Sequence, residues 1–364
     1  MNSPPPPSDT PDPARFLRDP SALALPWIES PFFEELLAAQ DLTSEERAIA
    51  RSYRDNGYAV IEDCFEPELI DAITAQYDWL FDPSTKFQLP YWAEDVLDAD
   101  RSRRQDAWCV CAPVKELATH PKMLRILQVL YGRAAIPFQT LNFQHGTEQS
   151  LHSDAFHFSS IPARFMTGVW VALEDITESN GPLRYVPGSH KLPDVQLADF
   201  GLWSQSPEGG LGHNYQVFEA YVKAALDKYD MPVEQLTCKK GSAVIWASHL
   251  LHGGSPILDS TSTRLSQVTH YYFEDCVYYT PAYSDTPIGE LFLRKVHDIR
   301  TGEQVPQIYN GSPMRVFSSN GERSRITASH GNKWEGPLPS GRRLDKLRRA
   351  VLRITRRIEK AWGR

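Results

Sequence analysis

The sequence has few of the features that would place a protein in a membrane or in an oxidising compartment. It contains no run of 18 apolar residues, which is about the length a helix needs to cross a bilayer. Four consecutive prolines stand near the start, where a secretory signal would have an apolar segment. The 364 residues include only five cysteines, without a CxxC pair or the spacing of a zinc site. We therefore predict reduced thiols and a cytoplasmic location.

Two histidine-containing motifs lie about a hundred residues apart in the chain. The first holds His152 and Asp154, and the second holds His249 and His252. On a β-strand, residues i and i+2 point to the same face, so His152 and Asp154 can reach one metal ion. Two imidazoles and one carboxylate on one face of an iron leave the opposite positions open for oxygen and an organic co-substrate. Either His249 or His252 could supply the third ligand.

Short strand-like segments surround both motifs. Alternation of apolar and polar residues, or a run of β-favouring residues, marks four of them: 136–143, 165–173, 242–246 and 264–273. Glycine, proline and asparagine residues between them predict turns. Short strands separated by such turns are typical of a sandwich or barrel. The sequence therefore predicts a mainly β fold with flanking helices and a jelly-roll core over about residues 130–275.

Three motifs occur in an order that resembles a known family. They are His152-Ser153-Asp154, then Asn180-Gly181-Pro182-Leu183, then His252-Gly253-Gly254-Ser255 followed by Arg264. Together they resemble the phytanoyl-CoA dioxygenase family of Fe(II)/2-oxoglutarate-dependent oxygenases, from about residue 53 to about residue 273. The resemblance implies a double-stranded β-helix. It also implies a metal held by His152, Asp154 and His252, because the distal ligand of the family directly precedes the glycine pair.

The resemblance further implies 2-oxoglutarate as co-substrate, with Arg264 as the anchor of its far carboxylate. A guanidinium suits that role because it stays charged and pairs bidentately with carboxylates. The resemblance places three more residues in the same pocket: Ser266, Trp170 and Gln139. An ordinary core position is the alternative for Trp170, and a solvent-exposed strand position is the alternative for Gln139.

Substrate contacts are predicted at three residues near the motifs: Phe156, His157 and Trp246. Aromatic residues also fill barrel cores, so a packing role is the alternative for Phe156 and Trp246. If the strand continued past Asp154, His157 would face away from the metal and lie at the rim of the site. We expect His270 to be a core histidine with its hydrogen bonds satisfied; the alternative is that it faces the barrel interior, since it lies six residues after Arg264.

The activity implied by the resemblance is hydroxylation of a C–H bond in a small molecule, with release of succinate and CO2. Asp154 favours hydroxylation over halogenation, because related halogenases replace this carboxylate with a small residue that leaves room for chloride. Two alternatives stay open at this point. A cupin-like metal enzyme that does not use 2-oxoglutarate would have no need for Arg264, and a non-catalytic jelly-roll binding protein would have no need for an intact metal site.

The domain layout follows from composition and patterning. We predict a disordered Pro-rich leader over residues 1–24, the oxygenase domain over 25–300 and an extension over 301–340. Helices are expected at 33–39, from Thr43 or Ser44 as N-cap, and from Pro67. An insertion over 191–238 contains an amphipathic segment at 217–229, which either covers the site or forms an ordinary packed surface helix.

Residues 341–364 form a strongly basic segment. They contain ten Lys and Arg residues against two acidic residues, a net charge of +8, and their apolar residues recur at helical spacing. A basic amphipathic helix can lie on an anionic membrane surface or bind an acidic protein partner. The alternative is that its apolar side packs on the main domain. Nucleic acid is a weaker candidate, because the rest of the chain carries a net charge of −16.

Overall fold

The computed structural model describes residues 12–90, 103–204, 210–318 and 324–328. The leader predicted over residues 1–24 is described only from residue 12, and Pro13–Leu17 forms a 3-10 helix, so regular structure begins earlier than predicted. The basic helix predicted over residues 341–364 lies outside the described residues. All five cysteines are free thiols. None of the described helices is long and apolar enough to span a membrane.

The largest element is a six-stranded antiparallel sheet with the order β1-β8-β5-β10-β3-β2. Its strands are β1 (Tyr58–Ile61), β2 (Arg103–Gln105), β3 (Ala135–Phe143), β5 (Met166–Ala172), β8 (Ala243–Ala247) and β10 (Ser266–Phe273). The four strands predicted from the sequence are β3, β5, β8 and β10, each within two residues of its predicted bounds. They form the centre of the sheet, between β1 and β2 at its edges.

A smaller sheet packs against the first. It has the order β7-β6-β9 and consists of β7 (Glu234–Gln235), β6 (Leu183–Tyr185) and β9 (His252–Gly254). Side chains from the two sheets meet in one apolar cluster: Trp170, Val244 and Val268 come from the large sheet, and Leu183 and Tyr185 from the small one. Two antiparallel sheets packed face to face in this way confirm the mainly β fold with a jelly-roll core.

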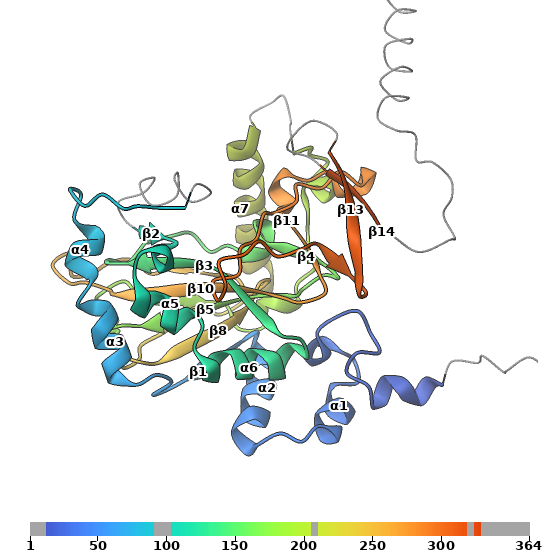
Figure 1. The fold of residues 1–364 in the computed structure, drawn as a ribbon, viewed down its shortest axis with the longest axis horizontal. Coiled ribbons are helices and arrows are strands. Elements are labelled where there is room, and N and C mark those ends of the chain that lie inside the picture. The colour runs from blue at the N-terminus through green and yellow to red at the C-terminus, as the bar shows by residue number, and fades with distance from the viewer. Residues whose placement is uncertain (1–11, 91–102, 205–209, 319–323, 329–364) are drawn as a thin grey trace, which may run out of the picture.

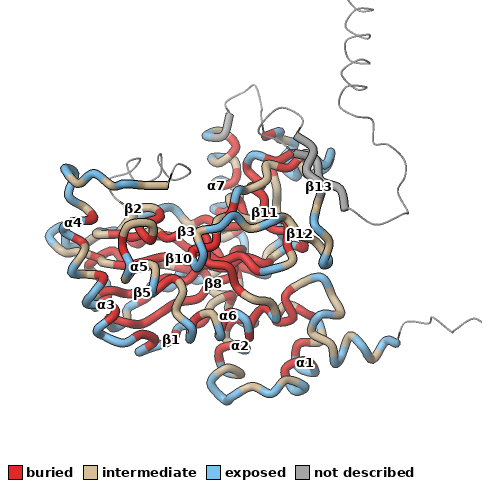
Figure 2. Tube along the Cα trace, in the orientation of Figure 1, coloured by how far each residue is buried: buried red, intermediate tan, exposed pale blue. Residues whose placement is uncertain are grey.

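Helices cover the outer face of the large sheet (Figure 1). They are α1 (Phe33–Ala39), α2 (Ser44–Asn56), α3 (Pro67–Thr74), α4 (Tyr77–Phe81), α5 (Ala112–Ala118) and α6 (Pro121–Tyr131). Strand residues alternate between the two faces, as the pleat requires. Val169 and Ile245 pack against the helices, whereas their neighbours Trp170 and Val244 point inward. Figure 2 shows the resulting band of buried residues along the strands.

The predicted helix starts near the amino terminus are confirmed. Thr43 caps α2 through a capping box: its hydroxyl accepts from the Glu46 backbone N–H at 3.1 Å, and the Glu46 carboxylate accepts from the Thr43 N–H at 2.9 Å. The helix ends at Gly57, whose φ of 84° lies in the left-handed region that favours glycine. The capping box and terminal glycine fix where β1 begins, at Tyr58.

The insertion over residues 191–238 contributes the long helix α7 (Gly210–Tyr229), at the top of Figure 1. Its Phe218 and Val222 are buried in a cluster with Phe156 and Leu251. Phe156 stacks on Phe218 with the ring centroids 4.7 Å apart. This helix therefore packs on the segment that directly follows Asp154.

The remaining elements are short. Two small sheets contain β4 (Ser159–Ile161) with β11 (Val277–Tyr279), and β12 (Ile308–Tyr309), β13 (Ser312–Ser318) and β14 (Ser324–Ala328). The 3-10 helices after the first are η2 (Trp27–Glu29), η3 (Ala107–Cys109), η4 (Asp154–Phe156), η5 (Ser189–Lys191), η6 (Leu197–Phe200), η7 (Pro281–Tyr283) and η8 (Thr286–Ile288).

A glycine in the centre of the large sheet generates the first prediction. Gly168 on β5 lies opposite Trp246 on β8, and a Cβ added to Gly168 would clash with Cε2 and Cζ2 of the fully buried indole. We expect Gly168→Ala to lower the free energy of unfolding by about 1–3 kcal/mol, the usual cost of overpacking a core. Urea unfolding followed by circular dichroism measures the change.

The control is Gly212→Ala on α7, where a new Cβ meets no atom within 4 Å. Replacing a helical glycine in open space should leave stability unchanged or raise it by up to about 1 kcal/mol. Equal stability of the two variants would contradict the close contact between Gly168 and Trp246.

Candidate active site

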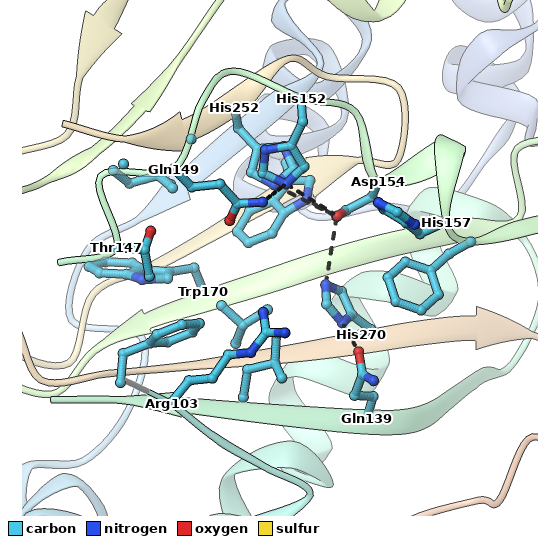
Figure 3. A pocket seen from close by; sticks show the side chains of 18 of the residues that line it. Arg103, Gln139, Thr147, Gln149, His152, Asp154, His157, Trp170, His252 and His270 are labelled. Atoms are coloured by element: carbon cyan, nitrogen blue, oxygen red, sulfur yellow. Dashed lines mark hydrogen bonds and ion pairs between the residues drawn. The ribbon is translucent and has the colours of Figure 1, made fainter. Parts of the chain in front are cut away.

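A cavity of about 420 Å³ lies between the two sheets. Its walls come from β2, β3, β5, β8 and β10 of the large sheet, from β6 and β9 of the small one, from the segment that contains residues 147–158, and from Tyr215 of α7. Figure 3 shows the polar side chains that point into it. Because both sheets contribute, residues from distant parts of the sequence face one another across this space.

His152, Asp154 and His252 meet at one end of the cavity. All three are buried, and one potential ligand atom from each lies within 4.8 Å of the others. The His152 Nε2 atom is 4.0 Å from Oδ1 of Asp154, and the His252 Nε2 atom is 3.8 Å from Oδ2 (Figure 3). Two imidazole nitrogens and one carboxylate in this arrangement match the donor set of a non-haem iron site with open positions.

Backbone hydrogen bonds bring the two histidines together. His152 and His252 form an isolated antiparallel bridge, in which each backbone N–H donates to the carbonyl of the other at 2.9 and 3.0 Å. The His152 Nδ1 donates to the Ser150 carbonyl, and the His252 Nδ1 donates to the Leu250 carbonyl. A carbonyl only accepts, so the proton is on Nδ1 in both rings. Each Nε2 then carries the lone pair that can bind a metal, and that of His152 accepts from the side-chain amide of Gln149 at 3.3 Å.

The glycine pair after His252 allows a close backbone approach. A Cβ on Gly253 would lie 2.5 Å from the Gln149 carbonyl oxygen, and one on Gly254 would lie 2.7 Å from the Glu148 nitrogen. Residues with side chains would push the 148–150 segment away from β9. The two glycines are therefore required for the backbone pairing that positions both histidines.

The segment His152-Ser153-Asp154 is not a strand, so this part of the prediction was wrong. Asp154 instead begins the 3-10 helix η4, with Ser153 as its N-cap. The Ser153 hydroxyl donates to the Ser248 carbonyl at 2.9 Å, which ties this turn to the segment before His252. Asp154 thus reaches the histidines through a turn, not through the alternation of a strand.

His252, and not His249, joins the other two residues. The His249 Nε2 atom is 3.5 Å from Oδ1 of Asp194, and its Nδ1 is 3.0 Å from the Ser248 hydroxyl. This imidazole lines a separate small cavity beside α7. The alternative that the sequence left open between the two histidines is therefore decided by geometry.

The electrostatics of the cluster suit a divalent cation. Burial, together with the neighbouring His252, lowers the pKa of His152 to about 4. Burial opposes ionisation of Asp154, but His252, His270 and His152 hold the pKa of this carboxyl well below its usual range. At neutral pH the cluster therefore offers a neutral imidazole at His152 and a charged carboxylate, which is the protonation state that metal binding requires.

Trp246 was predicted to contact substrate, and its main contact is with the metal-site carboxylate. Its indole Nε1 donates to Oδ2 of Asp154 at 2.8 Å, and its ring lies 4.6 Å from that of His252. Gly168 leaves the space that the indole occupies. Such hydrogen bonds from a surrounding residue fix the orientation of a ligand. A glycine inside a predicted strand was the available signal for this close approach.

His270 is buried with partners for both ring nitrogens, as predicted, and it also lines the cavity. Its Nε2 atom is 3.6 Å from Oδ2 of Asp154, and its Nδ1 is 2.9 Å from Oε1 of Gln139. Val268 and His270 line the same cavity because alternate residues of β10 share a face. Gln139 is buried in the cavity wall, so the solvent-exposed alternative is wrong.

Arg264 is the buried cation of the cavity, with 3% of its surface exposed. It precedes β10, and its guanidinium carbon lies 5.5 Å from the ring of Phe143 and 5.9 Å from that of Trp170. Its Nη2 donates to the His145 carbonyl, whereas its Nε has no partner. Burial lowers the pKa of Arg264 to about 10, so it stays charged at neutral pH.

No carboxylate of the described part of the chain forms an ion pair with this guanidinium within 4.0 Å. A buried charge without a counter-ion is costly, so the site favours an anionic ligand. The indole Nε1 of Trp170 is also buried without a partner in the same cavity. These two groups meet the requirements of a carboxylate-bearing co-substrate.

Of the three remaining predicted site residues, one lines the cavity and two do not. His157 lines the cavity and is half-buried. Phe156 does not: the η4 turn directs its side chain away from the cavity, into the buried cluster where it stacks on Phe218 of α7. Ser266 is fully buried on β10, its hydroxyl has no partner, and it is not among the residues that line the cavity.

The sequence matches the phytanoyl-CoA dioxygenase (PhyH) family over residues 53–264, which is more than half of the chain. The chain belongs to the phytanoyl-CoA dioxygenase family. This PhyH-family protein is therefore an Fe(II)- and 2-oxoglutarate-dependent dioxygenase, with iron and 2-oxoglutarate as cofactor and co-substrate. The family match includes both histidine motifs and extends to Arg264.

Individual relatives are distant. The peroxisomal phytanoyl-CoA dioxygenase of Rattus norvegicus is 23% identical over 268 residues, which cover 68% of this chain and 73% of that protein. The Mus musculus enzyme is also 23% identical, over 61% of this chain and 66% of its own length. Among solved structures, the non-heme alpha-ketoglutarate-dependent epimerase SnoN from nogalamycin biosynthesis aligns with a TM-score of 0.49 at 20% identity, over 78% of this chain and 98% of SnoN.

The two neighbouring histidines give a matched pair of variants. We expect His252→Gln to abolish stoichiometric Fe(II) binding, because it removes one of three ligands. His249→Gln, three residues earlier, should retain it, because His249 faces Asp194. Anaerobic titration with Fe(II) and a chromogenic chelator measures both. Loss of iron binding in His249→Gln with retention in His252→Gln would reverse the assignment.

Removal of the indole N–H tests the role of Trp246. Trp246→Phe keeps an aromatic ring but loses the donor to Asp154, so we expect Fe(II) affinity to fall by about 10- to 100-fold, as for other residues that orient metal ligands. Competition with a chelator of known affinity measures the change. The control is Trp79→Phe at an exposed position on α4, which should bind iron as the unmodified protein does. Equal affinities in the two variants would contradict this role.

Proposed function

We propose that this protein hydroxylates a C–H bond of a small molecule, with iron held by His152, Asp154 and His252. The observation that carries the proposal is the presence of this triad and of the buried Arg264 in one cavity. A metal enzyme without an acidic co-substrate would have no use for a buried, unpaired guanidinium. The proposal therefore includes 2-oxoglutarate bound through Arg264, and release of succinate and CO2.

The bound iron would activate oxygen, and oxidative decarboxylation of 2-oxoglutarate would supply two electrons. The chain itself supplies orientation. The Nδ1–H bonds to Ser150 and Leu250 turn the Nε2 atoms of His152 and His252 toward the metal. Trp246 holds one oxygen of Asp154, which favours binding of the metal through the other oxygen. One oxygen per carboxylate leaves coordination positions for co-substrate and oxygen.

Arg264 binds the far carboxylate of 2-oxoglutarate in this proposal. The guanidinium presents parallel N–H donors that pair with both oxygens of a carboxylate. The Trp170 N–H and the apolar residues Leu141, Leu183 and Val268 complete that end of the cavity. Apolar walls exclude water and strengthen the ion pair.

Asp154 also supports hydroxylation as the outcome. A halogenating relative needs a vacant coordination position at this point of the site, and here a carboxylate fixed by Trp246 occupies that position. Hydroxylation of the substrate C–H bond is then the expected outcome. The names of the relatives describe dioxygenases that act on phytanoyl-CoA, but the substrate of this chain is a separate question.

Two further parts of the proposal concern location and partners. We infer a cytoplasmic location, supported by five cysteines that are all free thiols. We also infer that the basic segment at 341–364 binds an anionic membrane surface or an acidic protein, supported by its +8 charge and helical apolar spacing.

Succinate production tests the proposed chemistry. Protein loaded anaerobically with Fe(II) and 2-oxoglutarate should form succinate when oxygen is admitted, even slowly without substrate, and His152→Ala should form none.

Arg264→Leu should raise the dissociation constant for 2-oxoglutarate by about 100-fold, because loss of a buried charge partner costs about 2–5 kcal/mol. Calorimetry measures this dissociation constant, and mass spectrometry measures the succinate.

Absence of 2-oxoglutarate binding in the iron-loaded protein would overturn the proposal. Unchanged affinity in Arg264→Leu would overturn the role of that residue while leaving the metal site intact.

A further inference from the structure

A second cavity, of about 330 Å³, lies outside the active site. It is formed by η2, α2, η5 and the segment that precedes β5, and of the described residues that line it, none also lines the cavity of the metal-site triad. Its lining includes five residues with charged or imidazole side chains: Glu29, Arg54, Arg164, His190 and Lys191. We call it the His190 cavity. The dioxygenase chemistry proposed above does not use it.

Three basic residues meet around His190. The ring Nε2 of His190 donates to the Arg54 carbonyl oxygen at 3.1 Å. The His190 carbonyl oxygen accepts from Nη1 of Arg164 at 3.4 Å, and Lys191 follows His190 in the chain. Residues from α2, from the segment before β5 and from η5 therefore line one space, although they lie far apart in the sequence.

One of the three cations is already neutralised. Nη1 of Arg164 lies 2.6 Å from Oε2 of Glu29, and both side chains are mostly buried. The backbone of Arg164 has a φ of 73°, in the left-handed region that residues other than glycine rarely adopt. Backbone conformations of this kind persist only where the surrounding contacts fix them, and they are concentrated at ligand sites. The fold thus fixes the Arg164–Glu29 pair in the cavity wall.

The other two cations have no carboxylate partner. Nη1 of Arg54 donates to the Ile28 carbonyl at 2.9 Å, and its guanidinium carbon lies 5.6 Å from the centre of the Phe33 ring. Nζ of Lys191 donates to the Asp55 carbonyl at 2.9 Å. In the described part of the chain, no carboxylate oxygen lies within 4.0 Å of either basic group. Three positive charges and one negative charge leave the lining with a net charge of +2.

His190 itself adds no charge. It is 5% exposed, and burial lowers the pKa of its imidazole to about 4, so the ring is neutral at neutral pH. A carbonyl only accepts, so the single ring proton is on Nε2. The ring fits here because residue 57 is glycine: a Cβ at Gly57 would lie 2.5 Å from Nδ1 of His190. A buried, neutral ring therefore holds the basic residues in their arrangement.

We propose that the His190 cavity binds a small dianion with the chemistry of a phosphate group. Such a group carries a charge of about −1.5 to −2 at neutral pH, which matches the net charge of the lining. Its oxygens accept from the Arg54 guanidinium and the Lys191 ammonium. A guanidinium suits this role because its planar N–H groups bind two oxygens at once. The volume leaves room for a small organic group on the phosphate.

The cavity lies beside a turn that supports a metal-ligand strand. The Ser189 hydroxyl of η5 accepts from the Leu251 N–H at 2.8 Å, and Leu251 directly precedes His252 of β9. An anion bound in the His190 cavity would link α2 to η5. Because such an anion would bind the folded chain and not the unfolded one, it should raise the melting temperature.

The experiment measures binding to the full chain, loaded anaerobically with Fe(II), in a phosphate-free buffer. The probes are inorganic phosphate and methyl phosphate as dianions, and acetate as a monoanion. Calorimetry measures each affinity, and a thermal melt measures the stabilisation. We expect both phosphates to bind at least about ten-fold tighter than acetate, because two cations without a carboxylate partner favour a dianion.

Variants locate the bound phosphate. Arg54→Gln should weaken phosphate binding by at least about ten-fold, because it removes charge-assisted hydrogen bonds. Lys191→Gln should weaken it by at least about three-fold, a smaller effect because this side chain is exposed and solvent screens its charge. The matched control is Arg51→Gln on the same helix, an exposed arginine that pairs with Glu34, which should leave the affinity unchanged. Circular dichroism confirms that each variant is folded, and Lys191→Gln decides the test if Arg54→Gln does not fold.

Three results would overturn the inference. The first is that neither phosphate binds, or that acetate binds as tightly as both. The second is an unchanged phosphate affinity in every folded variant of Arg54 and Lys191. The third is loss of phosphate binding in Arg264→Leu together with its retention in Arg54→Gln, which would place the anion in the active-site cavity. None of these results bears on the dioxygenase proposal, which the binding of 2-oxoglutarate tests separately.

Discussion

The backbone bridge between His152 and His252 is the interaction on which the rest of the site depends. It joins a loop of the first half of the domain to β9 of the small sheet, across a hundred residues of sequence. Without it, the two imidazoles would have no common position. Side-chain hydrogen bonds then set the tautomer of each ring, and the Ser153–Ser248 bond sets the turn that carries Asp154. The positions of the metal-site side chains thus depend on this backbone pairing.

The packing of the large sheet also helps to position the metal-site carboxylate. Gly168 leaves room for the indole of Trp246, which in turn holds the carboxylate of Asp154. His270 on β10 approaches that carboxylate, and Gln139 on β3 holds the other nitrogen of the His270 ring. A core position and a metal ligand are therefore coupled, and stability and metal affinity depend on the same few contacts. This coupling explains why residues without any metal-binding chemistry are needed in the site.

Much of the fold and of the metal site was predictable from the sequence. The predictions that were wrong have physical reasons. The four central strands and the cap at Thr43 follow from local patterns, and the family resemblance identified His152, Asp154 and His252. The direction of Phe156 did not follow, because the hydrogen bond of Ser153 to Ser248 spans 95 residues and turns the chain after Asp154. The burial of His270 was predicted, but its contact with Asp154 was not, because the η4 turn that places Asp154 has no local sequence pattern. The cytoplasmic location and the role of residues 341–364 stay predictions.

The glycine pair after His252 can be used to judge whether a related sequence forms the same metal site. Its role is steric: it lets β9 lie against the 148–150 segment at a distance that no side chain permits. A chain with the same three ligand residues but with larger residues at these two positions would keep the chemical signature and lose the geometry. The motif thus reports two separate conditions, the donor atoms and the space between backbones. Only their joint presence distinguishes an assembled iron site from a coincidental arrangement of histidines.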